Sequence, residues 1–187
     1  MKIETQHIPS KGASLAFRKE AKNFNVLQQM ADQGECTFTE PIQIDLMIIA
    51  ERDLFKLKGL ITTTAQMPCS RCLVAYDLPI QHKFTLRFSN QIPADLHIND
   101  DDQIELTADQ IGLIYFEGEQ IDLQEPIQEQ VVLSLPFKPL CSDNCKGLCQ
   151  RCGADLNVKN CACDKERSNS PFSVLTQRQW PSKSQEK

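Results

Sequence analysis

The sequence predicts an α+β protein, mainly an antiparallel sheet with a packed helix, braced by four-cysteine zinc knuckles. Three segments, 41–50, 54–65 and 74–88, alternate apolar and polar residues, which is typical of strands with one buried face. Apolar residues then recur every fourth position after Asp122, the pattern of a helix that packs on one side. Eight of the nine cysteines fall in two clusters, whose spacing favours bound metal.

The composition is that of a globular protein. The chain has 187 residues, of which 41% are hydrophobic and 24% charged, so a disordered or fibrous protein is excluded. The longest apolar run, residues 46–50, is far too short to cross a membrane. The first residues, MKIETQHIPSKG, contain no apolar signal segment. We therefore expect a soluble cytoplasmic protein with no membrane partner.

The N-terminal part of the chain predicts one strand and one helix. Residues 1–9 alternate and suggest a first strand. The composition of 18–33, with Phe24, Leu27 and Met30 spaced by three, suggests a helix ended by the following glycine.

Three longer strands follow. Residues 41–50 and 54–65 predict two strands joined by a hairpin turn at 51–53. In 74–88 the even-numbered residues, apolar except for His82, share one face, which predicts a long, half-buried strand. The other face carries Asp77, Gln81, Lys83, Thr85 and Arg87. Cys69 and Cys72 then fall in the connection between two strands.

The second half begins with an acidic loop at 90–110 and a short apolar run at 111–116. Asp122, with Glu125 three residues later, predicts the N-cap of a helix that ends before Pro136. Residues 171–175 predict a short C-terminal helix. We expect two domains: 1–137, an α+β sheet domain with the first zinc knuckle at 69–72, and 138–187, a cysteine-rich zinc-binding segment with a short helix.

The clustered cysteines indicate metal ligands. Without a secretory signal the thiols stay reduced, and reduced thiols in clusters are typical of zinc sites. An iron–sulfur cluster and redox or disulfide chemistry are the two alternatives. Cys69 and Cys72 cannot fill a tetrahedral site alone, and eight thiols suffice for two closed sites. We expect about two zinc ions per chain.

We assign the ligands by proximity along the chain. The first site takes Cys69, Cys72, Cys141 and Cys145, and the second takes Cys149, Cys152, Cys161 and Cys163. A rival assignment forms one site from Cys141, Cys145, Cys149 and Cys152. In an extended chain the sulfurs of Cys161 and Cys163 would lie too far apart, so a turn is needed there, and Asn160 could supply it.

No catalytic constellation is visible in the sequence. A closed four-thiolate site leaves no position for water or substrate. There is no glycine-rich phosphate loop, no Gly-x-Ser-x-Gly and no His-Glu-x-x-His. We interpret Cys36 as a small, partly buried residue and His82 as a satisfied or rim histidine. The sequence favours a non-enzymatic binding or structural protein over a hydrolase.

The charges are unevenly distributed. Residues 1–137 carry a net charge of −9 and residues 138–187 a net charge of +4. One hypothesis is that the basic segment contacts RNA phosphates through Lys138, Lys146, Arg151, Lys159, Lys165, Arg167 and Arg178. The alternative is a protein adaptor, whose acidic belt at 95–129 holds a basic ribosomal protein or recruits an RNA-processing enzyme.

Together these motifs resemble the YceD family of large ribosomal RNA subunit accumulation proteins. The residues that carry the resemblance are Cys69-Ser70-Arg71-Cys72, Ile121-Asp122-Leu123 with Glu129 and Val132, Leu135 to Cys141, Cys145 to Gly153, Asp155-Leu156-Asn157, Cys161-Ala162-Cys163 and Pro171 to Leu175. The resemblance covers about 60–175. Gln150 departs from the family, in which many members have proline there.

The resemblance implies a bacterial or plastid factor in the accumulation or processing of large-subunit (23S) ribosomal RNA and in ribosome assembly. The implied partner is that RNA or the pre-50S particle. Some family members keep the first knuckle and the cysteine pair after the helix but lack the later knuckle, which supports two separate sites. The family resemblance does not choose between RNA binding and the adaptor.

Overall fold

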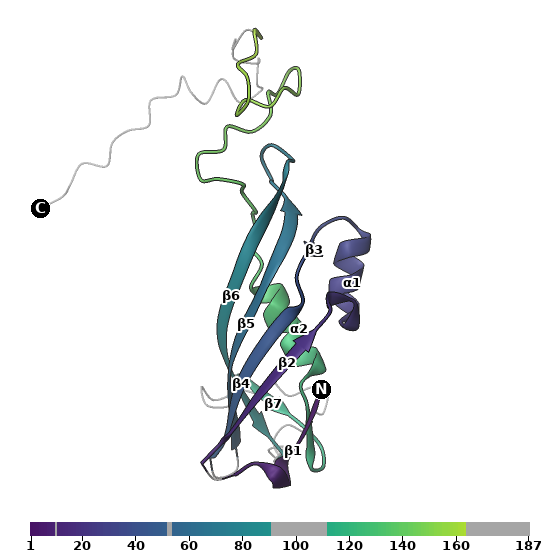
Figure 1. Cartoon of the computed structure of the whole chain (residues 1–187), viewed down its shortest axis with the longest axis vertical. Helices are drawn as coiled ribbons and strands as arrows, with labels where there is room; N and C mark the ends of the chain where they lie inside the picture. The colour runs from purple at the N-terminus through teal and green to yellow at the C-terminus, as the bar shows by residue number, and fades with distance from the viewer. Residues whose placement is uncertain (10, 52–53, 91–111, 164–187) are drawn as a thin grey trace, which may run out of the picture. The chain divides into compact units, whose positions relative to one another are not determined.

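The computed structural model describes residues 1–9, 11–51, 54–90 and 112–163. The chain forms two compact units, Met1–Cys145 and Lys146–Lys187, which we describe separately. The fold is α+β with a mainly antiparallel sheet, as predicted (Figure 1). The two domains expected on either side of residue 137 stay a prediction.

The first unit is organised around one sheet whose strands run in the order β2, β4, β5, β6, β7. Their bounds are Ala13–Lys19 (β2), Ile42–Glu51 (β4), Leu54–Pro68 (β5), Ala75–Ser89 (β6) and Leu113–Tyr115 (β7), and β3 (Thr37–Phe38) pairs with β5. All these pairs are antiparallel except β6 with β7, which is parallel. The predicted strands at 41–50, 54–65 and 74–88 are therefore confirmed as β4, β5 and β6.

Strands β5 and β6 form a long hairpin that positions the first cysteines. They pair from Leu54 opposite Ser89 to Pro68 opposite Ala75. The connection at the tip is only residues 69–74, which contain Cys69 and Cys72 as predicted. At the other end, Glu51 pairs with Leu54, although residues 52–53 of the predicted turn lie outside the described part.

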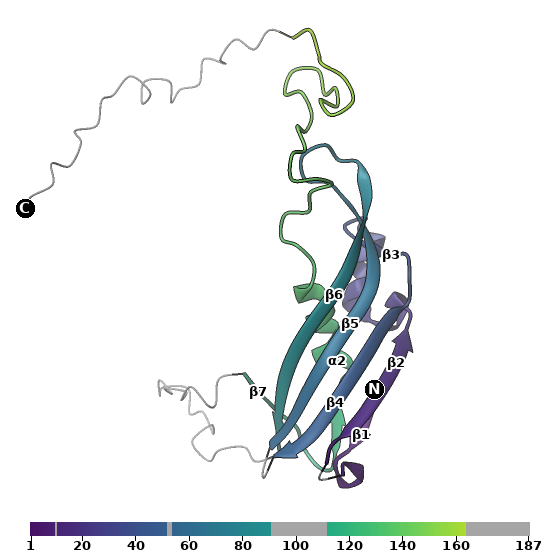
Figure 2. The ribbon, with the colours of Figure 1, turned by 60° about the vertical axis from the view of Figure 1, so that its left-hand side comes forward.

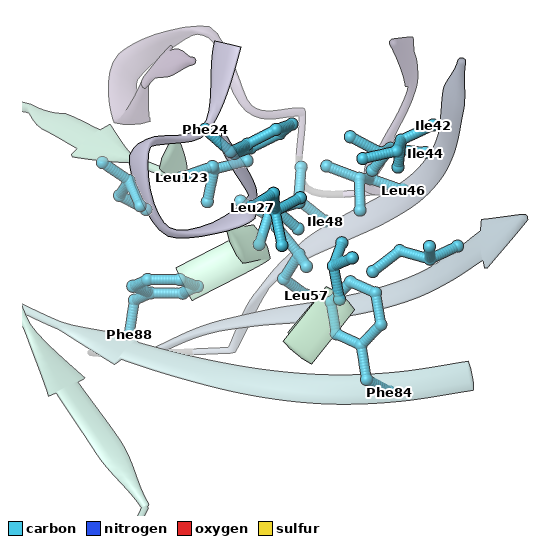
Figure 3. Close-up of a cluster of buried hydrophobic side chains, with 14 residues drawn as sticks. Phe24, Leu27, Ile42, Ile44, Leu46, Ile48, Leu57, Phe84, Phe88 and Leu123 are labelled. Atoms are coloured by element: carbon cyan, nitrogen blue, oxygen red, sulfur yellow. The ribbon is translucent and has the colours of Figure 1, made fainter. Parts of the chain in front are cut away.

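The core lies on one face of the sheet. Ile42, Ile44, Leu46 and Ile48 alternate along β4 and are all buried. They pack with side chains from both helices and from β5 and β6, a set whose labelled members in Figure 3 include Phe24, Leu27, Leu57, Phe84, Phe88 and Leu123. Burial of this apolar surface, at about 25 cal/mol per Å², is the main force that orders the first unit.

Two helices supply the other half of the core. Helix α1 spans Asn25–Asp32 and buries Leu27, and α2 spans Gln124–Leu133 and buries Ile127 and Val131. Both lie behind the sheet in Figure 2. A second small sheet pairs β1 (Lys2–Glu4) with β8 (Gln120–Asp122), and short 3₁₀ turns occupy Thr5–His7 (η1) and Ala21–Asn23 (η2).

The N-terminal predictions need correction. The expected helix at 18–33 begins only at Asn25, because Arg18 and Lys19 belong to β2 and pair with Gln43 and Ile42. Hydrogen bonding to a neighbouring strand outweighs the local helix preference of these residues. The expected strand at 1–9 is shorter, because it ends at Glu4 and continues as η1.

The start of α2 is displaced from the prediction. Leu123, not Asp122, occupies the N-cap position, and Asp122 is the last residue of β8. The Asp122 carboxylate nevertheless accepts the backbone N–H of Gln124 at 2.9 Å, and this hydrogen bond lowers the pKa of the carboxyl group. Beyond Asn90, the predicted acidic loop at 90–110 lies outside the described residues, as does the predicted helix at 171–175.

Within the described residues, no helix is both long and apolar enough to cross a membrane.

Gly59 permits a close contact that the sheet requires. It lies opposite Phe84, and a Cβ at position 59 would overlap the Phe84 ring. We expect Gly59→Ala to lower the free energy of unfolding by about 1–3 kcal/mol, because the ring must leave its packed position. Urea unfolding of the purified variant measures this.

The matched control is Lys58→Ala, whose side chain is exposed on the opposite face; we expect it to stay within about 0.5 kcal/mol of the parent. Phe84→Leu combined with Gly59→Ala should cost less than the sum of the two single changes. A Gly59→Ala protein as stable as the parent would contradict the overlap.

Candidate metal centres

The first cysteine cluster forms at the tip of the β5–β6 hairpin. Cys69 and Cys72 come from the tip, and Cys141 and Cys145 come from the segment that follows α2. Cys69, Cys72 and Cys145 are buried, and Cys141 is exposed. Four thiols that are distant in sequence therefore meet within the first unit.

A tight backbone turn orients the first two thiols. The N–H of Cys69 donates to the carbonyl of Val74 at 3.0 Å, and the N–H of Leu73 donates to the carbonyl of Cys69 at 2.9 Å. Leu73 has a φ of 61°, a left-handed conformation that residues other than glycine adopt at some energetic cost. The turn places both sulfurs on the same side of the tip, where they meet the other pair.

The sulfur geometry fits a tetrahedral metal ion. All four Sγ atoms lie within 4.8 Å of one another, with 3.8 Å between Cys69 and Cys145 and 3.7 Å between Cys72 and Cys141. A tetrahedral ion with metal–sulfur bonds of about 2.3 Å would hold its sulfurs about 3.8 Å apart. The four residues could therefore hold one metal ion.

The thiol pKa values of the first cluster also favour a bound cation. The pKa of the Cys69 thiol falls to about 6, chiefly because the backbone N–H of Cys141 donates to the sulfur. The pKa of Cys141 rises to about 12, led by its hydrogen bond with the Cys145 side chain. Four thiolates this close repel one another, so a divalent cation is the natural partner of the fully ionised set.

Arg71 and Ser70 hold the two halves of this cluster together. The Arg71 guanidinium donates to the carbonyl of Cys145 at 2.8 Å, and the Ser70 N–H donates to the carbonyl of Pro139 at 2.8 Å. This role of Arg71 is not among the predictions from the sequence. Its position between the two knuckle cysteines is the one signal that could have suggested it.

The second cluster lies wholly within the second unit. The Sγ atoms of Cys149, Cys152, Cys161 and Cys163 all lie within 4.8 Å of one another. The sulfurs of Cys161 and Cys163 thus converge, although the backbone at 160–163 has no regular secondary structure. Cys152 is exposed and the other three are half-buried, so this cluster is more open than the first.

The second knuckle repeats the hydrogen bonding of the first. The N–H of Cys149 donates to the carbonyl of Ala154 at 2.8 Å, and the N–H of Gly153 donates to the carbonyl of Cys149 at 2.9 Å. Gly153, with a φ of 69°, occupies the position that Leu73 has in the first knuckle. The pKa of Cys149 falls to about 6, chiefly through the backbone N–H of Cys152.

Asp155 and Asn157 brace this unit. The Asp155 carboxylate accepts the backbone N–H of Asn157 at 2.8 Å and its side-chain amide at 2.7 Å. The carbonyl oxygen of the Asn157 side chain in turn accepts the N–H of Lys146 at 2.7 Å. These bonds hold the chain ahead of Cys149 against the chain ahead of Cys161.

The structure groups the cysteines as the first assignment has them. Cys141 and Cys145 lie with Cys69 and Cys72, so the rival site built from Cys141, Cys145, Cys149 and Cys152 does not form. Whether either group carries an ion, and which ion, stays a prediction.

The structure also describes Cys36, His82 and four of the seven basic residues expected to contact RNA. Cys36 is buried, 1% exposed, and burial raises its pKa to about 11, so it is not a thiolate at neutral pH. A ring nitrogen of His82 lies 3.3 Å from the side-chain oxygen of Gln130, in hydrogen-bonding contact. Lys138, in the first unit, is exposed, as are Lys146, Arg151 and Lys159 in the second. Lys165, Arg167 and Arg178 lie outside the described residues.

Comparison with known proteins identifies the family. A family model described as "Large ribosomal RNA subunit accumulation protein YceD" matches residues 57–177, a range that contains every cysteine of both clusters. The chain belongs to the YceD family.

Curated relatives of this YceD-family chain come from plants and mycobacteria. It is 24% identical over 84% of its length to the chloroplastic "Large ribosomal RNA subunit accumulation protein YCED homolog 1" of Arabidopsis thaliana, and 24% identical over 72% to that of Zea mays. It is 29% identical over 64% of its length to an uncharacterized protein of Mycobacterium leprae. The matches span 54%, 52% and 51% of those proteins, about half of each. No solved structure matches the chain.

The two clusters predict the metal content of the purified protein. We expect two metal ions per chain, falling to about one in Cys141→Ser and also to about one in Cys152→Ser, because each variant removes a ligand from a different cluster. Elemental analysis of protein purified without chelators measures this. Cys36→Ser is the matched control and should keep two. A metal-free parent protein, or a Cys141→Ser variant that retains two ions, would refute the assignment.

Proposed function

We propose that this chain is a non-catalytic, zinc-braced factor that supports the accumulation of large-subunit (23S) ribosomal RNA by binding RNA during ribosome assembly in the cytoplasm. Membership of the YceD family, whose name refers to this RNA, supports the process. The observation that favours direct RNA contact is an exposed aromatic residue beside a lysine, Phe137 and Lys138.

Zinc is the ion we propose for both clusters. Each donor set consists of four sulfurs within 4.8 Å of one another, and in the first cluster the sulfur separations of 3.7 and 3.8 Å suit a closed tetrahedral site. When bound, the ion would supply a cross-link and no open coordination position. We therefore assign both centres to folding, which agrees with the absence of a catalytic constellation in the sequence.

Phe137 is placed to stack on a base. Its side chain is fully exposed, with a relative accessibility of 106%, and it lies directly before the exposed Lys138. A core residue would not be left in water, whereas an aromatic ring beside a cation is the usual platform for an unpaired base and its phosphate. The segment is short and runs into Cys141, so the first cluster would hold this platform in place.

The second unit supplies further cations. Lys146, Arg151 and Lys159 are exposed around the second cluster. A zinc ion with four thiolates carries a net charge of about −2, which offsets part of this positive charge. We therefore expect moderate RNA affinity that falls steeply with salt.

Replacement of Phe137 tests the stacking contact. We expect Phe137→Ala to weaken binding of a single-stranded RNA by about 1–3 kcal/mol, the usual contribution of one stacked base. Fluorescence anisotropy with a labelled fragment of large-subunit RNA measures the affinity. Leu133→Ala, which removes another exposed apolar side chain (69% exposed) from the end of α2, is the matched control. Equal affinity of the two variants would argue against stacking.

A second candidate function is the protein adaptor, and one feature of the first unit favours it. A cavity of about 740 Å³ lies among β7, β8 and the start of α2, and the described residues that line it include Glu117, Asp122 and Glu125 but no lysine or arginine. An acidic cavity suits a basic partner such as a ribosomal protein, or a basic segment of an RNA-processing enzyme.

Neutralising the acidic residues of this cavity distinguishes the adaptor function from direct RNA binding. If the chain is an adaptor, Glu117→Gln with Glu125→Gln should reduce capture of large-subunit ribosomal proteins by at least fivefold and leave RNA affinity equal or slightly higher. The control is Glu20→Gln with Glu35→Gln, the same charge change at exposed positions that do not line the cavity. Capture that is unaffected, with RNA binding intact, would leave direct RNA binding as the function.

A further inference from the structure

The face of the sheet opposite the helices is open to solvent. Along β5 and β6 the buried residues alternate with exposed or half-buried ones, and among the described residues both helices lie on the buried side (Figure 2). The outward side chains of β5 and β6 include Lys56, Lys58, Lys83 and Arg87. We call these four residues the basic sheet face.

The strand register brings the four cations together. Lys56 lies directly opposite Arg87, and Lys58 lies opposite Thr85, the residue between Lys83 and Arg87 on the same face. Directly opposed residues are about 5 Å apart and diagonal neighbours about 7–8 Å. Four positive charges therefore occupy a patch five residues long, from Lys83 to Arg87 on β6, across two strands.

Three of these cations have no carboxylate partner among the described residues. Lys56 contacts Glu51 at 3.7 Å, whereas Lys58, Lys83 and Arg87 form no ion pair within the part of the chain that the structure describes. Asp45, on β4, is the nearest other acid on this face by strand register. Like charges gathered on neighbouring strands destabilise a sheet, so this arrangement of cations does not contribute to the stability of the fold.

We propose that the basic sheet face binds the phosphate backbone of single-stranded RNA, as a second contact surface beside the Phe137 platform; this inference rests on the proposed function. Charge complementarity selects the occupant, because the chain as a whole has a net charge of −5 while this patch is positive.

The surface between the strands suits a backbone rather than a base-reading contact. A hollow of about 590 Å³ lies on this face, and its lining includes the charged Lys58, Lys83 and Asp45 and the apolar Met47 and Leu60. No aromatic side chain points outward from β4, β5 or β6, which removes the usual means of stacking bases on a sheet. Binding at this face should therefore depend on salt and little on sequence.

The experiment compares three variants of the full chain, each lacking positive charges. The sheet variant carries Lys58→Gln, Lys83→Gln and Arg87→Gln, all exposed side chains. The matched control carries Lys2→Gln, Lys11→Gln and Lys22→Gln, which are exposed outside this face. The platform variant carries Phe137→Ala and Lys138→Gln. Anisotropy with a labelled uridine oligomer of about 20 nucleotides, from about 50 to about 200 mM salt, gives affinity and salt slope.

We expect the sheet variant to lose about fivefold in affinity at 0.1 M salt for each phosphate contact removed, and its salt slope to fall by about 2 for three contacts. The control should change the slope by less than about 0.5. If the sheet variant binds and responds to salt like the control while the platform variant is weakened, this inference fails and the proposed function stands. If the parent chain does not bind the oligomer at all, both fail.

Three further measurements keep the test decisive. If the sheet variant proves misfolded by circular dichroism, Lys83→Gln and Arg87→Gln are measured singly, and each should lower the slope by about 0.7. Displacement of the RNA by polyglutamate of equal length at an equal or lower concentration would assign the face to an acidic protein. A dimer of the parent chain that the sheet variant dissociates would assign it to a second copy. Either result overturns the proposal.

Discussion

The sulfurs of Cys69, Cys72, Cys141 and Cys145 converge to within 4.8 Å, and this convergence determines where the chain goes after α2. Closing the 68-residue gap between Cys72 and Cys141 costs about 4 kcal/mol in loop entropy, plus a constant. The backbone N–H of Cys141 lowers the pKa of Cys69 to about 6, whereas the hydrogen bond with the Cys145 side chain raises the pKa of Cys141 to about 12. Four ionised sulfurs at that distance would repel one another, which is a second cost. A structural divalent ion contributes roughly 10 kcal/mol or more, enough to offset both costs. An ion bound there would order both the hairpin tip and the segment carrying Phe137.

The two knuckles have the same backbone conformation at equivalent positions, but different residues adopt it. Each needs a left-handed residue four positions after its first cysteine, and Gly153 adopts this conformation without a steric penalty. Leu73 adopts it at a cost of about 1–2 kcal/mol. A strained residue persists where its surroundings over-determine it. Around Leu73 those surroundings are the paired strands and the Arg71 bond to Cys145, which the more open second knuckle lacks.

The features predictable from the sequence were those fixed by a periodic pattern or by counting ligands. Strands β4, β5 and β6 each bury one face, so their sequences alternate between apolar and polar residues. Eight thiols provide the ligands of two four-coordinate sites. Strand β2 was missed, and Arg18 was assigned to a helix, because its short alternation becomes decisive only when it pairs with β4. The role of Arg71 and the strain at Leu73 were invisible, since both arise from contacts between distant segments or from backbone angles. The basic sheet face was missed for a related reason: only the register brings Lys83 and Arg87 beside Lys56 and Lys58.

Charge explains why two RNA-contact surfaces in one acidic chain would behave differently. A four-thiolate zinc centre is negative, and Lys138 lies three residues from its ligand Cys141, so its attraction for phosphate is partly cancelled. Lys58 precedes Cys69 by eleven residues, almost all of them in β5, and at the rise of a strand this separation is about 35 Å. That separation is several times the Debye length of about 8–10 Å in physiological salt, so the thiolate charge does not reach the basic sheet face. In this arrangement the platform depends more on stacking and the sheet face on charge, and metal removal would disorder the first while leaving the second as long as the sheet stays folded.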